Sequence, residues 1–404
     1  MFKTFLSLVN AAPSAVALID GQTGEITTRE ALLTRARQLA RGIRPGEAVP
    51  VQLPNSVDFV ATFLATLERG AAMVPIDRGE VGPIGRIGPL GHIGLIKLTS
   101  GSSGAPKGIV TTEANLIADC RNICSSMGIA PDDINLGAIP FSHSYGFSNL
   151  VTPLILQGTP VVFSNDYLPQ SLIEIANRYR CTVAPLIPMV FAHLATTSHG
   201  AFESVRTFIS AGAPLPATTS RKFRERFGID IHSFYGCSEC GGIAYDRAGG
   251  AVERGTVGTA LDGVTLETDG ARLIVRSAAV AAEFHGTFIT DDLAEMRDGE
   301  VALTGRASDL INTAGKKVNP REVEAVILQI DGVREAKVYG EPAGARGEVV
   351  AAAIVATPDV TRELVREFCR ARMSLHKVPR IVKLIDAMPV DERGKVKRAA
   401  LAAL

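Results

Sequence analysis

The sequence predicts an α/β protein: a large N-terminal domain of layered βαβ subdomains, then a small β-rich subdomain, then an α+β C-terminal domain. Between residues 130 and 240, short apolar strands such as VVFS and TVAPLI alternate with helical stretches such as SLIEIANRYR. This alternation is typical of βαβ units around a mostly parallel sheet. Beyond residue 250 the pattern is shorter and punctuated by glycine, with strands near RLIVRS and VALTG. We place the last domain boundary between residues 308 and 309.

The segment after residue 309 has its own start signals for helices and strands. Asn319 can cap a helix that has Pro320 at its first position and Glu322 three residues after the cap. Strands are predicted near EAKVYG and VVAAAIV, and the helix TRELVREFCRARM follows them. This succession of capped helices and strands predicts a separate α+β unit over residues 309–404.

The composition excludes several classes of protein. With 404 residues, 46% of them hydrophobic, the chain can bury substantial cores in two or more domains. Its 42 basic and 42 acidic residues cancel, so no strong field favours nucleic acid or an anionic membrane. We therefore expect small molecules or one specific protein as partners, and no nucleic acid.

The N-terminus MFKTFLSLVNAAPSAVAL has the lysine, apolar stretch and Ala-x-Ala of a secretory signal, but Asn10 and Pro13 interrupt the apolar run. A helix follows, with a capping box from Thr27 to Glu30. We interpret the segment as the amphipathic first helix of a cytoplasmic protein, and no apolar stretch reaches membrane-spanning length. The apolar stripe predicted for the helix after Thr27 is Leu32, Ala36, Leu39 and Ile43.

Two further patterns have simple interpretations. Among six scattered cysteines, Cys237 and Cys240 have a suggestive spacing, but no second pair or nearby histidine completes a zinc site, so free thiols are favoured. Glycine recurs at every third position from Gly82 to Gly94, which is too few triplets for collagen and predicts an extended linker or loop.

Residues 98–110, LTSGSSGAPKGIV, combine hydroxyl side chains, glycines and one lysine, Lys107. Hydroxyls and uncovered backbone N–H groups donate to phosphate oxygens, glycines allow a close approach, and the lysine adds a positive charge. The segment differs from the P-loop, because Pro106 precedes the lysine, Gly108 follows it, and the next residues, IVTT, read as a strand. We expect a loop that joins two strands, with a helix starting near Glu113. A plain Gly/Ser-rich surface turn is the alternative.

Seven motifs follow one another along the chain. They are LTSGSSGAPKG at 98–108, PFSHSYGF at 140–147, ISAGAPLP at 209–216, FYGCSE at 234–239, TDDL at 290–293, GRASDLINTAGKKVNPREVE at 305–324 and ERGKVKRAAL at 392–401. Together these motifs resemble, over nearly the whole length of the chain, the adenylate-forming superfamily of acyl-CoA synthetases, adenylation domains and luciferases. The resemblance implies that a domain over residues 1–308 makes an acyl-adenylate from a carboxylic acid and ATP.

The resemblance assigns roles to single residues. It implies that Glu239 binds magnesium, that Asp292 accepts both ribose hydroxyls with Arg306 as its basic partner, and that Tyr235 lies against adenine. Lys395 matches the catalytic lysine of a mobile C-terminal domain over residues 309–404. The other residues implied at the ATP site are the loop residues Thr99, Ser100, Gly101, Ser102, Ser103, Gly104 and the catalytic Lys107, with Gly212, Ala213, Pro214, Gly236 and Ser238.

The resemblance also implies a hinge and an acyl pocket. Asp309 matches the hinge about which the C-terminal domain rotates between adenylation and thioester formation. Members that adenylate amino acids usually have an aspartate where this chain has His143-Ser144-Tyr145, so an apolar or aromatic acid is favoured over an α-amino acid. His143 is equally well interpreted as a core or gating histidine. The predicted acyl-pocket residues are His143, Tyr145, Phe147, Met189 and Ala211.

Three functions remain open from the sequence. The leading one is an acid–thiol ligase that uses ATP, Mg²⁺ and coenzyme A. The second delivers the acyl group to the phosphopantetheine of an acyl carrier protein, and the third is a non-catalytic acyl-nucleotide binding protein. The chain also departs from the family, because only about twenty residues separate VPID at 74–77 from the phosphate loop. Part of the N-terminal subdomain is expected to be missing.

Overall fold

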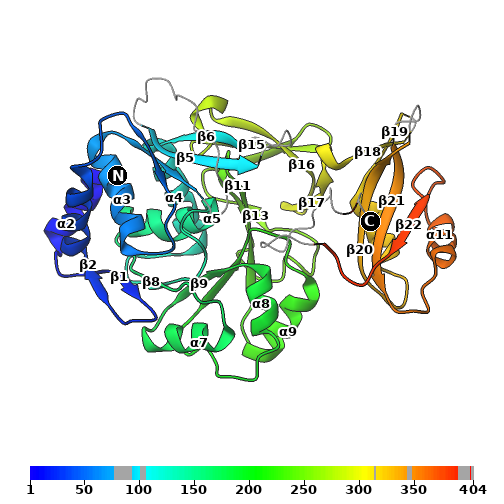
Figure 1. The fold of residues 1–404 in the computed structure, drawn as a ribbon, viewed down its shortest axis with the longest axis horizontal. Helices are drawn as coiled ribbons and strands as arrows, with labels where there is room; N and C mark the ends of the chain where they lie inside the picture. The colour runs from blue at the N-terminus through cyan, green and yellow to red at the C-terminus, as the bar shows by residue number, and fades with distance from the viewer. Residues whose placement is uncertain (77–92, 101–105, 314, 344–347, 390–400, 402–404) are drawn as a thin grey trace. The chain divides into compact units, whose positions relative to one another are not determined.

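The computed structural model describes residues 1–76, 93–100, 106–313, 315–343, 348–389 and 401. It forms two compact units, which we describe separately (Figure 1). The N-terminal unit comprises Met1–Glu267, Ile274–Ile289 and Met296–Val301, and the C-terminal unit comprises Thr268–Leu273, Thr290–Glu295 and Ala302–Leu404. The boundary that we place at residues 308 and 309 stays a prediction.

The N-terminal unit is built around a sheet whose strands run in the order β13-β12-β11-β10-β9-β7-β8-β1-β2. The pairs from β11 to β10, β9, β7, β8 and β1 are parallel, which confirms the predicted α/β class. The strands are β1 (Val16–Asp20), β2 (Ile26–Thr28), β7 (Asn135–Gly137), β8 (Val161–Phe163), β9 (Val183–Leu186), β10 (Thr207–Ser210), β11 (Ile231–Cys237), β12 (Gly241–Tyr245) and β13 (Thr259–Ala260).

Helices cover both faces of this sheet, so its central strands are apolar on both sides. Ala184 and Phe208 pack with α7 (Pro169–Arg178), α8 (Pro188–Leu194) and α9 (Ala217–Phe227). Their sequence neighbours Val183 and Ile209 point the other way and pack with Cys120 and Ile123 of α4 (Glu113–Met127). The alternation of side chains along each strand therefore divides the core into two clusters.

A second sheet has the order β3-β4-β5-β6 and packs against the first helices of the chain. Its strands β5 and β6 are antiparallel and place Thr99 opposite Lys107, so the predicted strand, loop, strand arrangement is confirmed. The loop residues 101–105 lie outside the described residues. The elements are α1 (Phe2–Ala11), α2 (Arg29–Ala40), β3 (Ala48–Val51), α3 (Val57–Arg69), β4 (Ala72–Pro75), β5 (Ile93–Ser100) and β6 (Pro106–Thr112).

Three local predictions for this part of the chain need correction or comment. The cap of α2 is Thr28 and not Thr27: its hydroxyl accepts from the Ala31 N–H at 3.2 Å, one residue later than the capping box predicts. Gly94 lies inside β5, so the predicted glycine linker is wrong at its last member. The earlier glycines, at 82, 85, 88 and 91, lie outside the described residues. Thr112 caps α4 as expected.

A short helical segment follows β7 and turns sharply back toward it. A Cβ atom on Gly146 would lie 2.0 Å from the Pro140 carbonyl oxygen, so only glycine fits here. The segment consists of α5 (Ser144–Gly146), the π-helical turn η1 (Phe147–Val151) and α6 (Thr152–Leu156).

The β-rich part predicted after residue 250 is present, and its residues are divided between the two units. Its elements are β14 (Val264–Thr268), β15 (Arg272–Ser277), the 3-10 turn η2 (Ala282–Phe284), β16 (Thr287–Arg297) and β17 (Glu300–Arg306).

The C-terminal unit has its own core, as an independent α+β domain requires. Val323 of α10 and Val365 of α11 pack against the inner face of a three-stranded sheet, β20-β21-β22, at Val350 and Ile354. The elements are η3 (Ala307–Asp309), β18 (Ile311–Thr313), β19 (Lys316–Val318), α10 (Pro320–Ile327), β20 (Val333–Pro342), β21 (Glu348–Ala356), α11 (Arg362–Arg370) and β22 (Ile381–Leu384).

Asn319 caps α10 as predicted, accepting from the Arg321 N–H at 3.1 Å. Its amide also donates to the Thr304 carbonyl at 2.9 Å. Glu322 does not complete a capping box, because its carboxylate pairs with Lys377 at 2.5 Å. A tertiary ion pair has here displaced the local contact that the sequence pattern suggests.

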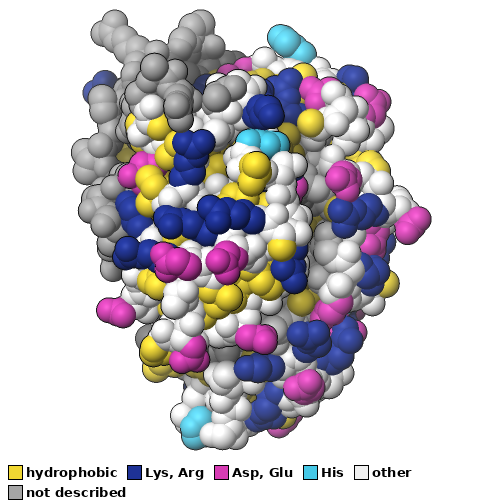
Figure 2. All heavy atoms as spheres, turned by 90° about the vertical axis from the view of Figure 1, so that its right-hand side faces the viewer, with side chains coloured by type: hydrophobic (Ala, Val, Ile, Leu, Met, Phe, Trp, Pro, Cys, Tyr) yellow, Lys and Arg dark blue, Asp and Glu magenta, His cyan; other side chains and the backbone are white. Residues whose placement is uncertain are grey.

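The surface agrees with the balanced numbers of acidic and basic residues. Figure 2 shows one face of the molecule, on which acidic and basic side chains are interspersed.

All six cysteines are free thiols, and Cys237 is the partly exposed one. Burial raises the pKa of Cys181 to about 12. Within the described part of the chain, no helix combines the length and the apolar composition needed to cross a bilayer.

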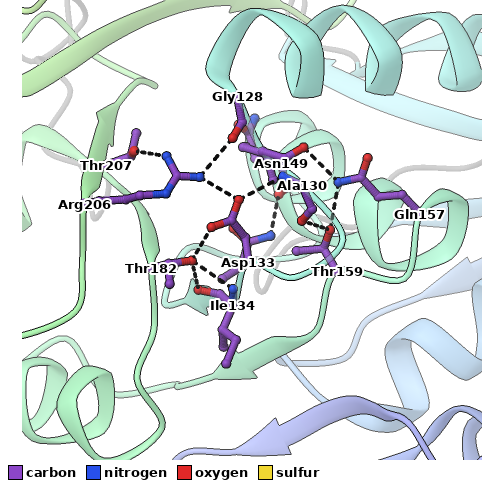
Figure 3. A network of polar contacts seen from close by, with 12 residues as sticks. Gly128, Ala130, Asp133, Ile134, Asn149, Gln157, Thr159, Thr182, Arg206 and Thr207 are labelled. Carbon is purple, nitrogen blue, oxygen red and sulfur yellow. Dashed lines mark hydrogen bonds and ion pairs between the residues drawn. The ribbon is translucent and has the colours of Figure 1, made fainter.

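Asp133 holds together the ends of three central strands (Figure 3). This buried carboxylate accepts from the Ala130 N–H at 2.8 Å, from the Thr182 hydroxyl at 2.6 Å and from Arg206 at 2.6 Å. Burial raises the pKa of Asp133, but these donors lower it more, so the net pKa is below its ordinary value. The folded protein therefore stabilises the charged form.

Asp133→Asn is expected to lower the free energy of unfolding at pH 7 by about 1–2 kcal/mol, because a neutral amide loses the charge-assisted bonds and Arg206 is half exposed. The contribution of a carboxylate with a lowered pKa is present above its unfolded pKa, near 3.9, and is lost as pH falls through the folded value. Urea unfolding at pH 7 and pH 3 measures this. The exposed neighbour Asp132→Asn is the control. If the free energies of unfolding of the variant and the parent differ equally at both pH values, the charge of Asp133 does not have this role.

Candidate active site

Four parallel strands end at one edge of the large sheet, and the predicted site segments follow them. Neighbouring strands β7, β9, β10 and β11 run in the same direction, so their carboxyl ends lie together. In open α/β sheets this edge is where ligands bind. The segments that follow these strands are 138–147, 187–189, 211–214 and 238–239.

The residues predicted at adenine belong to two of these strand ends. Gly212 has φ +86°, a left-handed conformation that glycine adopts without strain, and it opens an exposed turn with Ala213 and Pro214. Tyr235 lies near the end of the adjacent strand β11. Gly236 follows it, and a Cβ atom there would lie 2.5 Å from the Gly241 carbonyl oxygen. The fold therefore brings both predicted segments to the same sheet edge.

The turn after β11 meets the segment after β7. Ser238 and Ser144 place their hydroxyl oxygens 3.1 Å apart. The Glu239 carbonyl accepts from the Ala281 N–H at 2.8 Å, which fixes the backbone of this turn. The Glu239 side chain is partly exposed and makes no hydrogen bond or ion pair with the described residues.

The predicted acyl-pocket residues occupy different environments. The Tyr145 hydroxyl donates to the carbonyls of Ile209 at 2.9 Å and Leu186 at 3.4 Å, and burial raises its pKa well above the ordinary value. Phe147 is fully buried, and the centre of its ring lies 4.7 Å from the centre of the Phe63 ring. Its side chain therefore packs in the core.

The other three predicted pocket residues lie nearer the sheet edge. His143 is partly buried and directly precedes α5. Its backbone N–H donates to the Pro140 carbonyl at 3.3 Å. Ala211 is buried directly after β10. Met189 is the second residue of α8 and is 45% exposed. These positions leave both interpretations of His143 open.

Lys107 stands at the start of β6, beyond the phosphate loop. Its side chain is exposed, and its ammonium nitrogen lies 5.6 Å from the centre of the Phe284 ring, a cation–π distance. The backbone of Thr99 and Ser100 closes β5 on the other side of the loop. The remaining predicted loop residues, Gly101, Ser102, Ser103 and Gly104, lie outside the described residues.

Within the C-terminal unit, the predicted ribose pair is in contact. The Arg306 guanidinium lies 3.3 Å from an Asp292 carboxylate oxygen and 3.4 Å from Asp291. The Ser308 N–H donates to Asp291 at 3.0 Å, and the Thr290 hydroxyl accepts from the Asp292 N–H at 3.2 Å. Asp292 thus lies in the middle of β16, beside Arg306 at the end of β17. The predicted hinge, Asp309, ends the turn η3, and Lys395 lies outside the described residues.

Lys97 lies beside the candidate site, and our sequence reasoning did not single it out. It is only 6% exposed, and its ammonium donates to the Ser238 carbonyl at 3.4 Å. A signal was present: in IGLIKL, a charged residue interrupts an apolar strand two positions before the phosphate loop.

A mainly parallel sheet with helices on both faces and a separate C-terminal α+β unit define an α/β protein of two units. The chain belongs to the AMP-binding enzyme family: the family profile matches residues 7–80 and 89–268, and that of the AMP-binding enzyme C-terminal domain matches residues 322–395.

Relatives of known name span different shares of the chain. A putative acyl-CoA synthetase of Bacillus subtilis, YngI, is 28% identical over 76% of this chain and 62% of its own length. A sulfoacetate–CoA ligase of Cupriavidus necator is 27% identical over 75% of this chain and 65% of its own. The chain thus spans less than two thirds of the length of these two relatives. A feruloyl-CoA synthase of an Amycolatopsis species is 25% identical over 95% of both chains.

Solved structures share the fold across the chain. ATP-bound MatB from Rhodopseudomonas palustris has a TM-score of 0.84 at 23% identity, covering 100% of this chain and 98% of its own. The O-succinylbenzoate coenzyme A synthetase MenE from Bacillus subtilis, in complex with AMP, has a TM-score of 0.83 at 22% identity, covering 98% and 97%. At these identities the likeness establishes the fold.

Proposed function

We propose that this protein activates a carboxylic acid with ATP to an acyl-adenylate and transfers the acyl group to a thiol, that of coenzyme A. The observation that carries the proposal is the convergence of the family's motif segments at the carboxyl ends of β7, β9, β10 and β11. Named relatives are acyl-CoA synthetases and CoA ligases, which supports the same reaction class.

The proposed reaction has two steps, each balanced. A carboxylate oxygen attacks the α-phosphorus of ATP, and pyrophosphate leaves. The acceptor thiol, as thiolate, then attacks the acyl carbon, and AMP leaves. Since the first step joins two anions, cations must offset the charge that builds on phosphate. Lys107 and Lys395 are the proposed cations.

Magnesium fits this site as a cation shared with the nucleotide. The Glu239 carboxylate is partly exposed and unpaired among the described residues, and hard oxygen ligands suit Mg²⁺. The described residues contain no group of three or more His, Cys, Asp or Glu side chains that could hold a metal alone. Mg²⁺ is commonly held by one or two carboxylates plus phosphates, and it would supply charge neutralisation there.

The proposed substrate is an apolar or aromatic acid and not an α-amino acid. His143 and Ser144 stand where an α-ammonium would need a carboxylate partner. The exposed Met189 and the buried Ala211 are the apolar residues that we propose for the same pocket. The feruloyl-CoA synthase among the relatives acts, by its name, on an aromatic acid. The expected cytoplasmic location belongs to the same proposal.

Acid-dependent exchange of labelled pyrophosphate into ATP tests the proposal. We expect exchange with at least one member of a panel of aliphatic, aromatic and amino acids. If the protein binds the nucleotide but shows no exchange with any acid, the non-catalytic acyl-nucleotide binding protein is favoured. Coenzyme A and a pantetheinylated carrier protein, supplied separately, then identify the acceptor. Thioester formed only on the carrier would replace the coenzyme A proposal.

Asp292→Ala is expected to weaken ATP binding, because two hydrogen bonds to a charged acceptor, each worth about 1.5–3 kcal/mol, are lost. Titration with ATP and 2′-deoxy-ATP measures the loss and its cause. The parent should prefer ATP, and the variant should lose most of that preference. Asp291→Asn, which alters the neighbouring carboxylate, is the control and should keep it. Undiminished discrimination in the Asp292 variant would place this residue away from the ribose.

A further inference from the structure

Lys97 is a buried cation next to the proposed site. It lies in β5, where Leu95 faces the main hydrophobic core and Ile96 faces a separate cluster with Ala72 and Val74. Lys97 shares the side of Leu95 and stands opposite the buried Ile109 of β6. With 6% of its surface exposed, its ammonium has little access to water.

The environment of this ammonium is incomplete. Its hydrogen bond to a described residue goes to the neutral Ser238 carbonyl, at a long 3.4 Å. The ion pairs of the described residues give it no carboxylate. An ammonium has three N–H donors, and burial of an uncompensated charge costs free energy. The arrangement is therefore suited to an anion that the described residues do not provide.

A second group of donors lies at the same place. The Ser144 and Ser238 hydroxyl oxygens are 3.1 Å apart, so one hydroxyl hydrogen is used between them. The other has no acceptor among the described residues, because neither hydroxyl makes a second contact there. Ser238 thus contacts the Lys97 ammonium through its carbonyl oxygen and the Ser144 hydroxyl through its side chain. The junction of β5, α5 and the turn after β11 offers donors to an incoming acceptor.

We propose that Lys97, with the Ser144–Ser238 hydroxyl pair, forms an anion site that binds the carboxylate of the acid substrate. This assignment rests on the proposed function. A carboxylate has two oxygens, one for the ammonium and one for the hydroxyl donor. Ser144 lies between His143 and Tyr145, two predicted acyl-pocket residues, so the site adjoins the acyl side. Holding the carboxylate here offsets its repulsion from the α-phosphate.

Lys97→Met tests the site, because methionine keeps the length of the side chain and removes the charge. Calorimetric titration compares benzoate, cinnamate and hexanoate with their uncharged amides, with and without α,β-methylene-ATP and Mg²⁺. The parent should bind at least one acid more tightly than its amide. The variant should lose about 10- to 100-fold of acid affinity and none of amide affinity. Ile96→Met, on the opposite face of β5, is the control.

Other outcomes overturn the assignment. If no acid is preferred over its amide by the parent under either condition, the anion site is wrong. If Lys97→Met keeps the preference, Lys97 does not hold the carboxylate. If the variant loses affinity for α,β-methylene-ATP and not for acids, the anion is a phosphate. Should Lys97→Met not fold, Ser144→Ala decides, with an expected loss of about 2- to 10-fold for acids alone.

Pyrophosphate exchange separates this inference from the proposed function. A raised KM for the acid with an unchanged KM for ATP in Lys97→Met supports both. Parent protein that shows Lys97-dependent acid binding but no exchange with any acid retains the anion site and loses the ligase proposal.

Discussion

Lys395→Ala is expected to lower acid-dependent pyrophosphate exchange by about 10²–10³-fold, the loss typical of removing one group that stabilises developing charge. ATP affinity should change little, because the lysine acts where charge builds on the α-phosphate and not in the ground state. Exchange kinetics and an equilibrium titration with ATP measure the two quantities. Thioester formation from a supplied acyl-adenylate should survive, since that step does not need this cation.

The chain provides a matched control two residues away. Lys397 lies in the same GKVKR segment and is expected to be a solvated neighbour, so Lys397→Ala should retain normal exchange. A near-normal rate in the Lys395 variant would reject its role. Equal losses in both variants would point instead to the basic character of the segment as a whole.

Asp309→Pro should abolish one half-reaction and leave the other. Asp309 ends the turn η3, just after Arg306 and Ser308, which contact the paired aspartates. Proline fixes φ near −65° and lacks an N–H, so a residue that must adopt two backbone conformations would be held in one. The resemblance to domain-alternating enzymes implies that adenylation survives and that thioester formation is lost.

The two half-reactions must be measured separately, by pyrophosphate exchange and by release of coenzyme A thioester from a supplied adenylate. Asp309→Ala keeps a free φ and should retain both activities, which makes it the control. An equal loss of both half-reactions in the proline variant, with the fold intact by circular dichroism, would show that rotation about this residue is not needed.

Local rules predicted much of the architecture. The strand IKLTS, the loop and the strand GIVTT follow from β-branched residues on either side of small ones, and the structure pairs them as expected. The caps Thr112 and Asn319 follow from side chains that accept a backbone N–H within two or three residues. These signals are readable because all the atoms involved are close in sequence.

Tertiary contacts account for what the sequence did not predict. The Phe147 ring packs against that of Phe63 in α3, far away in the chain, and its place in the acyl pocket stays a prediction. Glu322 pairs with Lys377 instead of completing the capping box of α10. The environment of Lys97 arises only when β5 meets the turn after β11. Periodicity gives the face of a strand, but not which distant segment covers it.

Cys237 directly precedes Ser238, beside the place where an activated acyl group is proposed to form. Contact with the Cys240 thiol and burial both raise the pKa of Cys237 well above its ordinary value. At neutral pH its sulfur is therefore protonated, and a protonated thiol is a poor nucleophile. The thiolate, and not the thiol, is the form that would attack an acyl-adenylate. The raised pKa of Cys237 thus keeps this thiol in its less nucleophilic form, which favours the acceptor thiol in the proposed transfer.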